Sequence, residues 1–385
     1  MKTEYKKTKL GLIPEDWELV KLGDVVNKIS SGKTKTKSAE GKYPVYGSTG
    51  EIGKIGSSDY SGKRILVARV GANAGTLYQV DGSYGVSDNT LIVDVKPAAE
   101  INYVYNLLIK LRLTQMAFGS GQPLITGGQL KSLKIPLPPL PEQVRIADCL
   151  SQWDRGIALL ERLIAQKEEQ KKGLMQQLLT GRQRLPGFAG EWERVKLGDV
   201  TKRVKRKNTE LNDNVITISA QRGFVRQEDF FSKRVASSTL SNYYLLHKGE
   251  FAYNKSYSKG YPMGAFKRLD DFDKAVVTTL YICFKCKEHV DSDFMQQFFE
   301  GGMMIKGLMR VAQEGGRAHG LLNISLTDFF DLPLSLPPLP EQKAIAAVLN
   351  TADRELSLLG AKLGQYRLQK RGLMQQLLTG RKRLV

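Results

Sequence analysis

The spacing of hydrophobic residues changes abruptly at two places along the chain, and each change follows the same seven residues. After Leu-Pro-Pro-Leu-Pro-Glu-Gln at 137–143, and again after 336–342, proline disappears and apolar residues recur at alternating intervals of four and three. This heptad spacing is typical of helices that form a coiled coil. Each stretch runs for about 38 residues, which is about 57 Å of helix at 1.5 Å per residue. Neither helix could bury its apolar stripe alone, so the pattern predicts that the two helices pair.

We expect the two apolar stripes, which are related by a shift of 199 residues, to form the interface between these helices. An antiparallel pair is predicted because it relates the copies by a two-fold axis, whereas a parallel pair would require the intervening segment to span the helix. Trp153 and Ala352 stand at equivalent positions and are expected to face each other as a large and a small residue. The first stripe consists of Ile146, Leu150, Trp153, Ile157, Leu160, Ile164, Leu174 and Leu178, and the second of Ile345, Leu349, Ala352, Leu356, Leu359, Leu363, Tyr366, Leu373 and Leu377.

Two further segments are duplicated. Trp-Glu-x-Val-Lys-Leu-Gly-Asp-Val at 17–25 returns at 192–200, a shift of 175, and Gly-Leu-Met-Gln-Gln-Leu-Leu-Thr-Gly-Arg at 173–182 returns at 372–381, a shift of 199. The stretches between the repeats, 26–136 and 201–335, share little sequence. This arrangement predicts a duplicated frame that carries two unlike modules. We also expect residues 381–384 to lie near residues 11–14, because the linker 181–192 joins the equivalent ends in mid-chain.

The modules contain short runs rich in β-branched and aromatic residues, separated by turn residues. The predicted fold class is therefore α+β: two α+β modules separated by two long antiparallel coiled-coil helices, in a pseudo-two-fold, circular organisation. The expected domains are 1–141, 142–185 (first helix and linker), 186–340 and 341–385 (second helix). The expected strands are 43–50, 65–70, 89–95, 214–219, 250–253 and 275–285, and the expected module helices are 101–118 and 294–311.

The formal net charge of +19 changes the functional picture. The excess is +7 in residues 1–141, +2 in 142–185, +4 in 186–340 and +6 in 341–385, so it is spread over the whole chain. A folded body that is positive throughout favours a nucleic-acid partner, because phosphates neutralised by the protein release their counterions. The alternative is a basic protein kept soluble by self-repulsion. The chain has no apolar run of membrane-spanning length, no signal-peptide pattern and only three cysteines, so we expect a cytoplasmic protein without membrane contact.

Basic and amide side chains on module loops are the candidates for contacting double-stranded DNA. Lys33, Lys35 and Lys37 follow the first Leu-Gly-Asp-Val, and Lys202, Arg203, Lys205, Arg206 and Lys207 follow the second, so we expect both groups to contact phosphates. The competing interpretation is a solvated loop. For base edges the candidates are Ser48, Thr49, Arg69, Asn73, Asn89 and Gln122 in the first module, and Gln221, Arg222, Asn254, Lys255, Tyr257, Lys259, Arg317 and His319 in the second.

Residues that would indicate catalysis do not form a recognisable pattern. Gly32-Lys33-Thr34 resembles the end of a phosphate-binding loop, but position 27 is Asn where that loop needs glycine. Cys283 and Cys286 form one unpartnered pair on an expected strand, which favours packing over metal binding. The three histidines are scattered, and we see no nucleophile or acid–base dyad. The sequence therefore predicts a protein that is not an enzyme and has no metal site or cofactor of its own.

The three duplicated segments together resemble the specificity subunit of type I restriction-modification enzymes, and the resemblance covers the whole chain. It implies two target recognition domains that each read half of a bipartite DNA sequence, and helices that set the spacing between the halves. It also implies binding to two modification subunits, which methylate adenine at N6 with S-adenosylmethionine, and to restriction subunits, which cleave DNA with ATP and Mg2+. These cofactors are then expected on the partners. Two other functions stay open on the residues alone: a stand-alone bivalent DNA-binding protein of architectural or regulatory type, and a nuclease in its own right.

Overall fold

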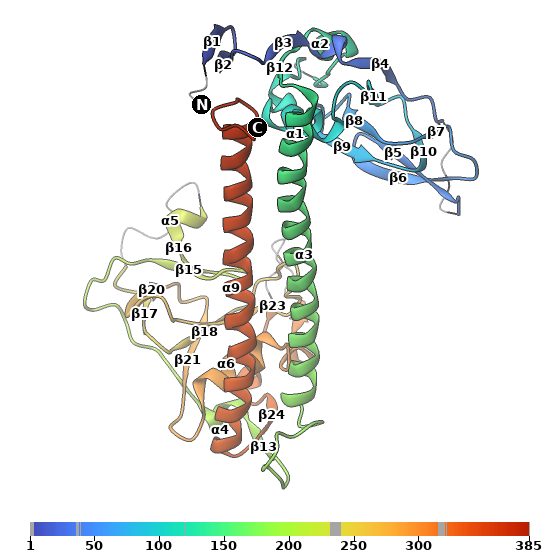
Figure 1. Ribbon diagram of the computed structural model, residues 1–385. Helices are drawn as coiled ribbons and strands as arrows, with labels where there is room; N and C mark the ends of the chain where they lie inside the picture. The colour runs from blue at the N-terminus through green and yellow to red at the C-terminus, as the bar shows by residue number, and fades with distance from the viewer. Residues whose placement is uncertain are drawn as a thin grey trace. The chain divides into compact units, whose positions relative to one another are not determined.

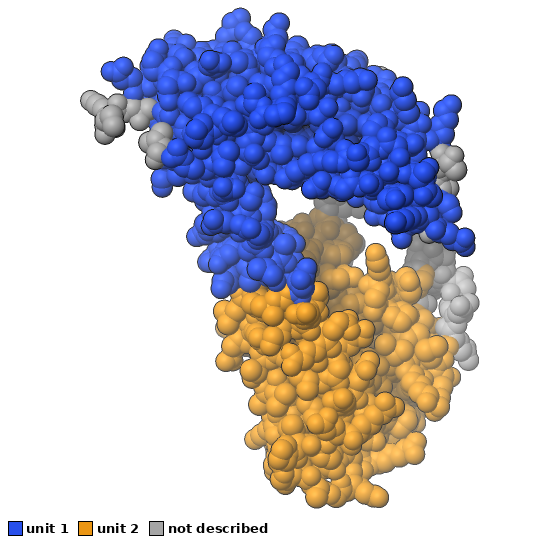
Figure 2. All heavy atoms as spheres, turned by 45° about the vertical axis from the view of Figure 1, so that its right-hand side comes forward, with its two compact units in different colours: residues 1–162, 360–385 blue, residues 163–359 orange. Residues whose placement is uncertain are grey.

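The computed structural model describes residues 4–35, 38, 40–119, 121–231, 240–314, 320 and 322–384. The chain divides into two compact units, coloured separately in Figure 2, and each unit combines one module with parts of two long helices. The first unit comprises residues 1–162 and 360–385, and the second comprises residues 163–359. The long helices are α3 (Leu140–Leu178) and α9 (Leu339–Leu377), each of 39 residues, close to the length that the heptad pattern predicts.

The first module is built around two sheets and one main helix (Figure 1). A four-stranded sheet of order β4-β11-β8-β9 packs against α1, and a second sheet of order β6-β5-β10-β7 covers its other face. The elements are β1 (Tyr5–Thr8), β2 (Gly11–Pro14), β3 (Glu18–Lys21), η1 (Leu22–Asp24), β4 (Val26–Ser31), β5 (Tyr43–Gly47), β6 (Gly50–Ile55), β7 (Tyr60–Ser61), β8 (Arg64–Ala68), β9 (Leu77–Val80), β10 (Ser83–Val86), β11 (Thr90–Val95), α1 (Ile101–Lys110), η2 (Leu113–Met116), α2 (Gly127–Ser132) and β12 (Lys134–Leu137).

The second module repeats this plan with a different outer layer. Its central sheet has the order β14-β21-β18-β19, and the two-stranded sheets β15-β16 and β17-β20, here called the outer strands, cover one face. The elements are β13 (Glu193–Lys196), α4 (Leu197–Val200), β14 (Thr201–Arg203), β15 (Ile216–Ser219), β16 (Gly223–Arg226), α5 (Gln227–Phe230), β17 (Tyr244–His247), β18 (Phe251–Asn254), β19 (Ala265–Arg268), β20 (Lys274–Val277), β21 (Ile282–Cys286), α6 (Ser292–Glu300), α7 (Ile305–Val311), β22 (Gln313–Glu314), β23 (Leu322–Asn323), α8 (Leu326–Phe330) and β24 (Pro333–Leu336).

The two central sheets have the same antiparallel strand order although their sequences share little. Alternation along the strands explains how unlike residues build the same layers. In β18, Phe251 and Tyr253 face the helical core, while Ala252 faces the outer strands β15-β16 and β17-β20. In β8, Ile65 and Val67 face the helical core, and the residue between them faces the outer sheet. Both modules therefore need only a period-2 pattern at these strands, not particular residues.

Each module shares its helical core with the ends of the long helices. In the first unit, Tyr103 and Leu107 of α1 belong to one hydrophobic cluster with Leu150 of α3 and Leu377 of α9. In the second unit, residues of α6, the last turn of α3 and the first turns of α9 form the corresponding cluster. This continuous packing fixes each module to the helix ends in its own unit. Among the helices in the described ranges, none has the apolar length needed to cross a membrane.

The repeated glutamine of Leu-Pro-Pro-Leu-Pro-Glu-Gln connects the long helix to the module helix. Gln143 accepts a hydrogen bond from the backbone N–H of Glu100, the N-cap of α1, at 2.9 Å, and donates one to the Pro138 carbonyl at 2.8 Å. Gln342 makes the same pair of bonds in the second unit, with Asp291 and Pro337, both at 2.8 Å. Both glutamines are buried, so each amide satisfies polar groups that would otherwise lack partners.

The repeated Leu-Gly-Asp-Val closes a turn in each module. The Asp24 carboxylate accepts a hydrogen bond from the Lys21 backbone N–H at 2.9 Å, and Asp199 accepts the same bond from Lys196. A Cβ added at Gly23 would lie 3.1 Å from the Lys131 carbonyl oxygen, so glycine permits the close approach of α2. These residues are repeated because the frame needs them in both copies.

The predicted meeting of the chain ends is confirmed. Arg383 donates hydrogen bonds to both carboxylate oxygens of Glu142, at 2.7 and 2.8 Å, and the indole N–H of Trp17 donates to the same carboxylate at 3.0 Å. Arg383 also binds both oxygens of Asp16. Gly380 lies against the N-terminal segment, since its carbonyl accepts a hydrogen bond from the Tyr5 hydroxyl at 3.1 Å. We call the Trp17–Glu142–Arg383 group the terminal clasp.

The linker between the repeats makes the same arrangement within continuous chain. Arg184 donates to the two oxygens of Glu341 at 2.5 and 2.6 Å, and the Trp192 indole N–H donates to Glu341 at 3.2 Å. These three residues are the equivalents of Arg383, Glu142 and Trp17. In the second unit, these contacts are made by residues of one continuous linker and the start of α9. In the first unit, the equivalent contacts join the two ends of the chain.

Four predicted elements differ clearly from the observed ones. The strand expected over 43–50 ends at Gly47, because residues 48 and 49 form a turn before β6. The helix expected over 101–118 ends at Lys110, because Arg112 takes a left-handed conformation with φ of 50°. The strand expected over 275–285 is two strands, β20 and β21, since each pairs with different neighbours across a turn at 278–281. The helix expected over 294–311 is interrupted at Gly302, whose φ is 73°, and divides into α6 and α7.

Candidate nucleic-acid interface

One edge of the first module's central sheet brings most of its candidate residues together. β4 and β8 end at this edge and β11 begins there, so Lys33 and Lys35, Arg69 and Asn73, and Asn89 lie on adjacent connections. The Arg69 backbone N–H donates to the Asn89 carbonyl at 2.9 Å, and the Arg69 guanidinium donates to Ser31 at 3.2 Å. All of these candidates are exposed except Arg69, which is half-buried. We call this surface the first recognition edge.

The remaining candidates of the first module lie close to this edge. Gln122 is exposed in the segment before α2, which is joined to the edge because the Gly71 N–H donates to the Pro123 carbonyl at 2.9 Å. Ser48 and Thr49 form the turn between β5 and β6, and the Ser48 carbonyl accepts a hydrogen bond from Tyr78 of β9 at 3.2 Å. Lys37 lies outside the described residues.

The second module presents two connected loops at the corresponding edge of its sheet. The loop between β18 and β19 carries Lys255, Tyr257 and Lys259, and occupies the same place as the loop after β8 in the first sheet. Gln221, in the turn between β15 and β16, donates a hydrogen bond to the Lys259 carbonyl at 3.0 Å and so joins the two loops. Tyr257 is 64% exposed, which leaves its ring free to contact a ligand. We call this surface the second recognition edge.

Three further candidates of the second module have structural contacts. The Asn254 side chain accepts a hydrogen bond from the Ser256 N–H at 3.1 Å, which shapes the start of the β18–β19 loop. The Arg222 guanidinium lies 5.8 Å from the centre of the Phe230 ring. The Lys255 carbonyl accepts a hydrogen bond from the Leu322 N–H at 3.1 Å. Arg317 and His319 lie outside the described residues.

The basic segment 202–207 divides into exposed and engaged side chains. The side chains of Lys202 and Lys205 are exposed and have no hydrogen bond or ion pair with a described residue, and Arg203 is half-buried. Arg206, by contrast, donates to both oxygens of the buried Glu250 carboxylate, at 3.1 and 3.2 Å, and to the Leu245 carbonyl at 3.1 Å. The Lys207 ammonium donates to the Asn242 carbonyl at 2.7 Å.

Lys207 also lies 4.9 Å from the centre of the Tyr244 ring, a distance at which a cation–π attraction operates. Arg206 and Lys207 therefore hold the segment in place, and Lys202 and Lys205 are the side chains available to an external phosphate. Nothing in the local sequence distinguishes the two classes, because Glu250 stands 44 residues beyond Arg206.

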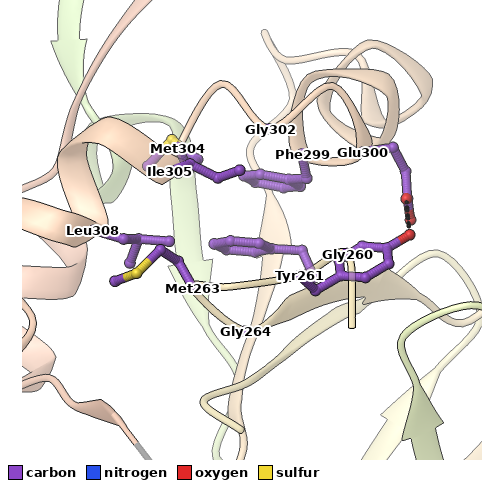
Figure 3. A pocket seen from close by; sticks show the side chains of 11 residues that line it. Gly260, Tyr261, Met263, Gly264, Phe299, Glu300, Gly302, Met304, Ile305 and Leu308 are labelled. Atoms are coloured by element: carbon purple, nitrogen blue, oxygen red, sulfur yellow. Dashed lines mark hydrogen bonds between the residues drawn. The ribbon is translucent and has the colours of Figure 1, made fainter. Parts of the chain in front are cut away.

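A cavity of about 180 Å3 opens beside the second recognition edge (Figure 3). Its floor contains Phe266, Phe299 and Met304, and Tyr261 at its rim donates a hydrogen bond to Glu300 at 3.1 Å. Burial, and then the neighbouring Glu300 charge, raises the pKa of the Tyr261 phenol to about 12, so this hydroxyl stays protonated and donates. The cavity thus has apolar side chains at its floor and, at its rim, a Glu300 carboxylate that is paired with both Tyr261 and Lys267.

The equivalent position in the first module is closely packed. A Cβ built on Gly75, in the loop between β8 and β9, would lie 2.5 Å from the Leu113 carbonyl carbon. The backbone after α1 therefore packs directly against this loop. The two recognition edges share a framework but carry different loops.

The predicted seam residues of α3 and α9 are all buried or half-buried, while Leu159, Leu358 and Leu368 between them are more than 60% exposed. In the first unit, the rings of Trp153 and Tyr366 pack at 5.2 Å with an interplanar angle of 69°. For the other seam residues, direct contact with the partner helix stays a prediction.

Ion pairs show that the two helices run antiparallel within each unit. In the first unit, Asp154 accepts from Lys370 at 2.5 Å and Glu161 from Arg367 at 2.6 Å. The prediction that Trp153 faces Ala352 is wrong, because antiparallel pairing brings Tyr366 to Trp153. In the second unit, Lys167 pairs with Glu355 at 2.8 Å and Lys171 with Asp353 at 2.5 Å, and Ala352 lies beside Lys171 and Leu174.

The two cysteines of the Cys283-x-x-Cys286 pair point to opposite faces of β21. Cys283 packs against the outer strands, and Cys286 packs against the helical core. Burial raises the pKa of each thiol to about 12, which keeps both protonated. No group of three or more metal-binding side chains gathers within the part of the chain that the structure describes.

Comparison with known proteins decides the family. The family described as "Type I restriction modification DNA specificity domain" matches the chain twice, at residues 14–169 and 189–364, once for each repeat. The chain belongs to this family. The MjaVIII type I restriction enzyme specificity subunit of Methanocaldococcus jannaschii is 27% identical over 429 residues, which cover 100% of this chain and 97% of that protein. The EcoprrI specificity subunit of Escherichia coli is 30% identical over 112 residues, 29% of this chain and 28% of that protein.

A solved structure supports the same fold. The S subunit of a type I restriction-modification system from M. genitalium superposes with a TM-score of 0.62 at 15% sequence identity, covering 98% of this chain and 99% of that one. The sequence expectation of a type I specificity subunit with two α+β modules and two long helices is confirmed at the level of family and fold. The candidate DNA-contacting residues stay predictions.

Proposed function

We propose that this chain is the noncatalytic DNA-specificity subunit of a type I restriction-modification complex. Each module acts as a target recognition domain that reads one half of a bipartite double-stranded DNA target, and the helices fix the spacing of the halves. The observation that carries this proposal is the duplicated specificity domain, matched over both repeats, each with its own distinct recognition edge. The recognition domains are residues 1–141 and 186–340, and the helical segments are 142–185 and 341–385.

The electrostatic and structural features of the edges support DNA contact. Lys33, Lys35, Lys202 and Lys205 are exposed cations in the segments that follow the two copies of Leu-Gly-Asp-Val, and they suit phosphate binding. Amide and hydroxyl groups on the adjacent loops provide donors and acceptors for base edges. Exposed Tyr257 adds an aromatic face next to these groups. Contacts with phosphates would set affinity, and loop contacts would set sequence preference.

The outer faces of the helices are proposed as docking surfaces for two modification subunits. Leu159 and Leu358 are equivalent positions in the two repeats, and their side chains are 63% and 66% exposed. Two equivalent exposed apolar side chains would suit two copies of one partner. Adenine-N6 methylation with S-adenosylmethionine and DNA cleavage with ATP and Mg2+ would then reside on modification and restriction subunits. We place the complex in the cytoplasm.

Exchange of one module tests this function directly. Residues 26–136 are replaced by the corresponding segment of another specificity subunit, and adenine methylation is mapped across the genome in cells that also contain the modification subunits. We expect one half of the methylated sequence to change and the other half to remain. A methylation map that is identical with and without this chain would refute the proposal.

A matched pair of substitutions tests the division within the basic segment. Lys205→Ala should weaken DNA binding similarly for all sequences and reduce the slope of log affinity against log salt by about 0.9, the value for one phosphate contact. Arg206→Ala should instead lower thermal stability, because it leaves the buried Glu250 carboxylate without its cation. Fluorescence titration at several salt concentrations and thermal melting separate the two effects. Equal salt slopes for Lys205→Ala and the parent would remove Lys205 from the interface.

A further inference from the structure

Five pairs of equivalent positions on the long helices, at or beside the seam, carry unlike side chains. The pairs, each related by the 199-residue shift, are Trp153 and Ala352, Gly156 and Glu355, Glu161 and Gly360, Lys167 and Tyr366, and Glu168 and Arg367. Other positions facing the partner helix are alike in the two copies: Asp154 and Lys171 correspond to Asp353 and Lys370, and Leu150 and Leu174 to Leu349 and Leu373. The five unlike pairs can therefore distinguish one repeat from the other.

In the first unit these positions form an aromatic layer and an ion pair. The Trp153 and Tyr366 rings pack at 5.2 Å. Gly156 lies beside the same tyrosine, since a Cβ at that position would be in van der Waals contact with the Tyr366 ring at 3.4 Å. Glu161 accepts a hydrogen bond from Arg367 at 2.6 Å. The aromatic layer therefore combines Trp153 and Tyr366 with the smallest residue, glycine, next to the tyrosine.

In the second unit, an ion pair takes the place of the aromatic packing at the equivalent positions. Lys167, the equivalent of Tyr366, pairs at 2.8 Å with Glu355, the equivalent of Gly156. Ala352 and Lys167 line a cavity of about 170 Å3 at the place that corresponds to the Trp153–Tyr366 contact. The contact layer of the first unit is aromatic and that of the second unit is ionic. In both layers, the side chains of the two helices complement each other only when one helix comes from each repeat.

Pairing a repeat with its own copy would lose these contacts. Two first repeats, aligned in the same antiparallel register, would place Trp153 and Gly156 against Lys167 and bring Glu161 to Glu168, a like-charge pair. Lys167 would have no carboxylate partner. The Asp154–Lys370 and Asp353–Lys171 pairs would form in any combination, so they do not discriminate.

Two second repeats would be mismatched in a different way. Tyr366 would meet Ala352 and the Glu355 carboxylate, and Arg367 would meet Gly360. No aromatic pair forms, and Arg367 has no acid to bind. Both self-pairings therefore lose the aromatic layer and both discriminating ion pairs at the same time.

We propose that these ten residues make the first repeat recognise the second repeat and reject its own copy from another molecule. The seam combines attraction in the correct pair with unfavourable contacts in the wrong ones, which is how specific helix pairs exclude alternatives. A second copy of this chain is thereby excluded as a donor of either helix. This inference does not depend on DNA binding.

Transposing the ten residues within the full-length chain provides the test. The first-helix variant carries W153A, G156E, E161G, K167Y and E168R, and the second-helix variant carries A352W, E355G, G360E, Y366K and R367E. The transposed variant carries all ten substitutions. Each helix keeps its number of glycines in every variant, so helix propensity is balanced.

Each five-residue variant should lower the Tm by about 5 °C or more, at about 2–4 °C for each 1 kcal/mol lost in a domain of this size. The transposed variant should recover more than half of that loss, because it restores all pairs in mirrored order. Recovery of less than half, or a five-residue variant that melts like the parent, overturns the proposal. If a five-residue variant is insoluble, solubility replaces Tm: a soluble transposed variant supports the proposal and an insoluble one overturns it.

Co-expression of two differently tagged parent chains gives an independent measurement. We expect neither tag to co-purify with the other. Co-purification through exchanged helices overturns the proposal. Neither measurement involves DNA or methylation, so their outcomes are separate from that of the proposed function.

Discussion

Arg383→Ala is expected to lower the free energy of unfolding by about 2–3 kcal/mol. The substitution removes the only cation bound to the buried Glu142 carboxylate among the described residues and leaves it the Trp17 indole and the Leu384 backbone N–H as partners. Removing one partner of a fully buried ion pair costs about 3–5 kcal/mol. We expect a smaller loss here because Arg383 keeps some solvent access. Urea unfolding of the full chain measures the change. Arg381→Ala is the matched control, since Arg381 is exposed and two residues away; equal losses in both variants would contradict the clasp.

This effect should depend on pH in a defined direction. The hydrogen bond from Arg383 lowers the pKa of the Asp16 carboxyl below its ordinary value of 3.8. A carboxyl whose pKa is depressed by folding stabilises the folded state above its unfolded pKa, and the contribution is lost as pH falls through the folded pKa. The difference between the parent and Arg383→Ala should therefore shrink below about pH 3.8.

Insertion of one heptad into each long helix is expected to lengthen the gap between the two half-sites of the methylated DNA sequence. Seven residues add about 10 Å at 1.5 Å per residue, which corresponds to about three base pairs at 3.4 Å each. Insertion after residue 162 in α3 and after residue 359 in α9 leaves both module cores unchanged. Methylation of the original sequence should fall to background, and the same two half-sites should be methylated with a longer gap.

The control for this experiment is a heptad in α3 alone. Unequal helices would misalign the seam, so this variant should lose stability and methylate neither target. Methylation of the original spacing by the doubly extended chain would contradict the role of the helices as the spacer.

The frame of the fold could be predicted from the sequence because its signals repeat. The heptad spacing indicated helices of nearly the observed length, and the shift of 199 residues indicated that two halves share one design. The meeting of the chain ends followed from the linker at 181–192. These features depend on local periodicity or on comparison of the chain with itself.

The fate of individual side chains could not be predicted in the same way. Arg206 and Lys205 are adjacent basic residues, yet one is held by Glu250 and the other is free, because the carboxylate comes from a distant turn. Trp153 met Tyr366 and not Ala352, since the partner of a residue depends on helix direction and register. The strand order that the two central sheets share could not be predicted either. Alternating burial constrains the polarity of strand residues but not their identity.

The shared strand order has a consequence for how such genes change. Folding of each module depends on alternating apolar positions in four strands and on a few frame residues at its borders, such as Gln143 and Gln342. The loops at the sheet edge contribute little to those requirements. Mutation and recombination can therefore alter the loops repeatedly while the module still assembles, so a lineage can acquire new sequence preferences faster than it loses a working protein.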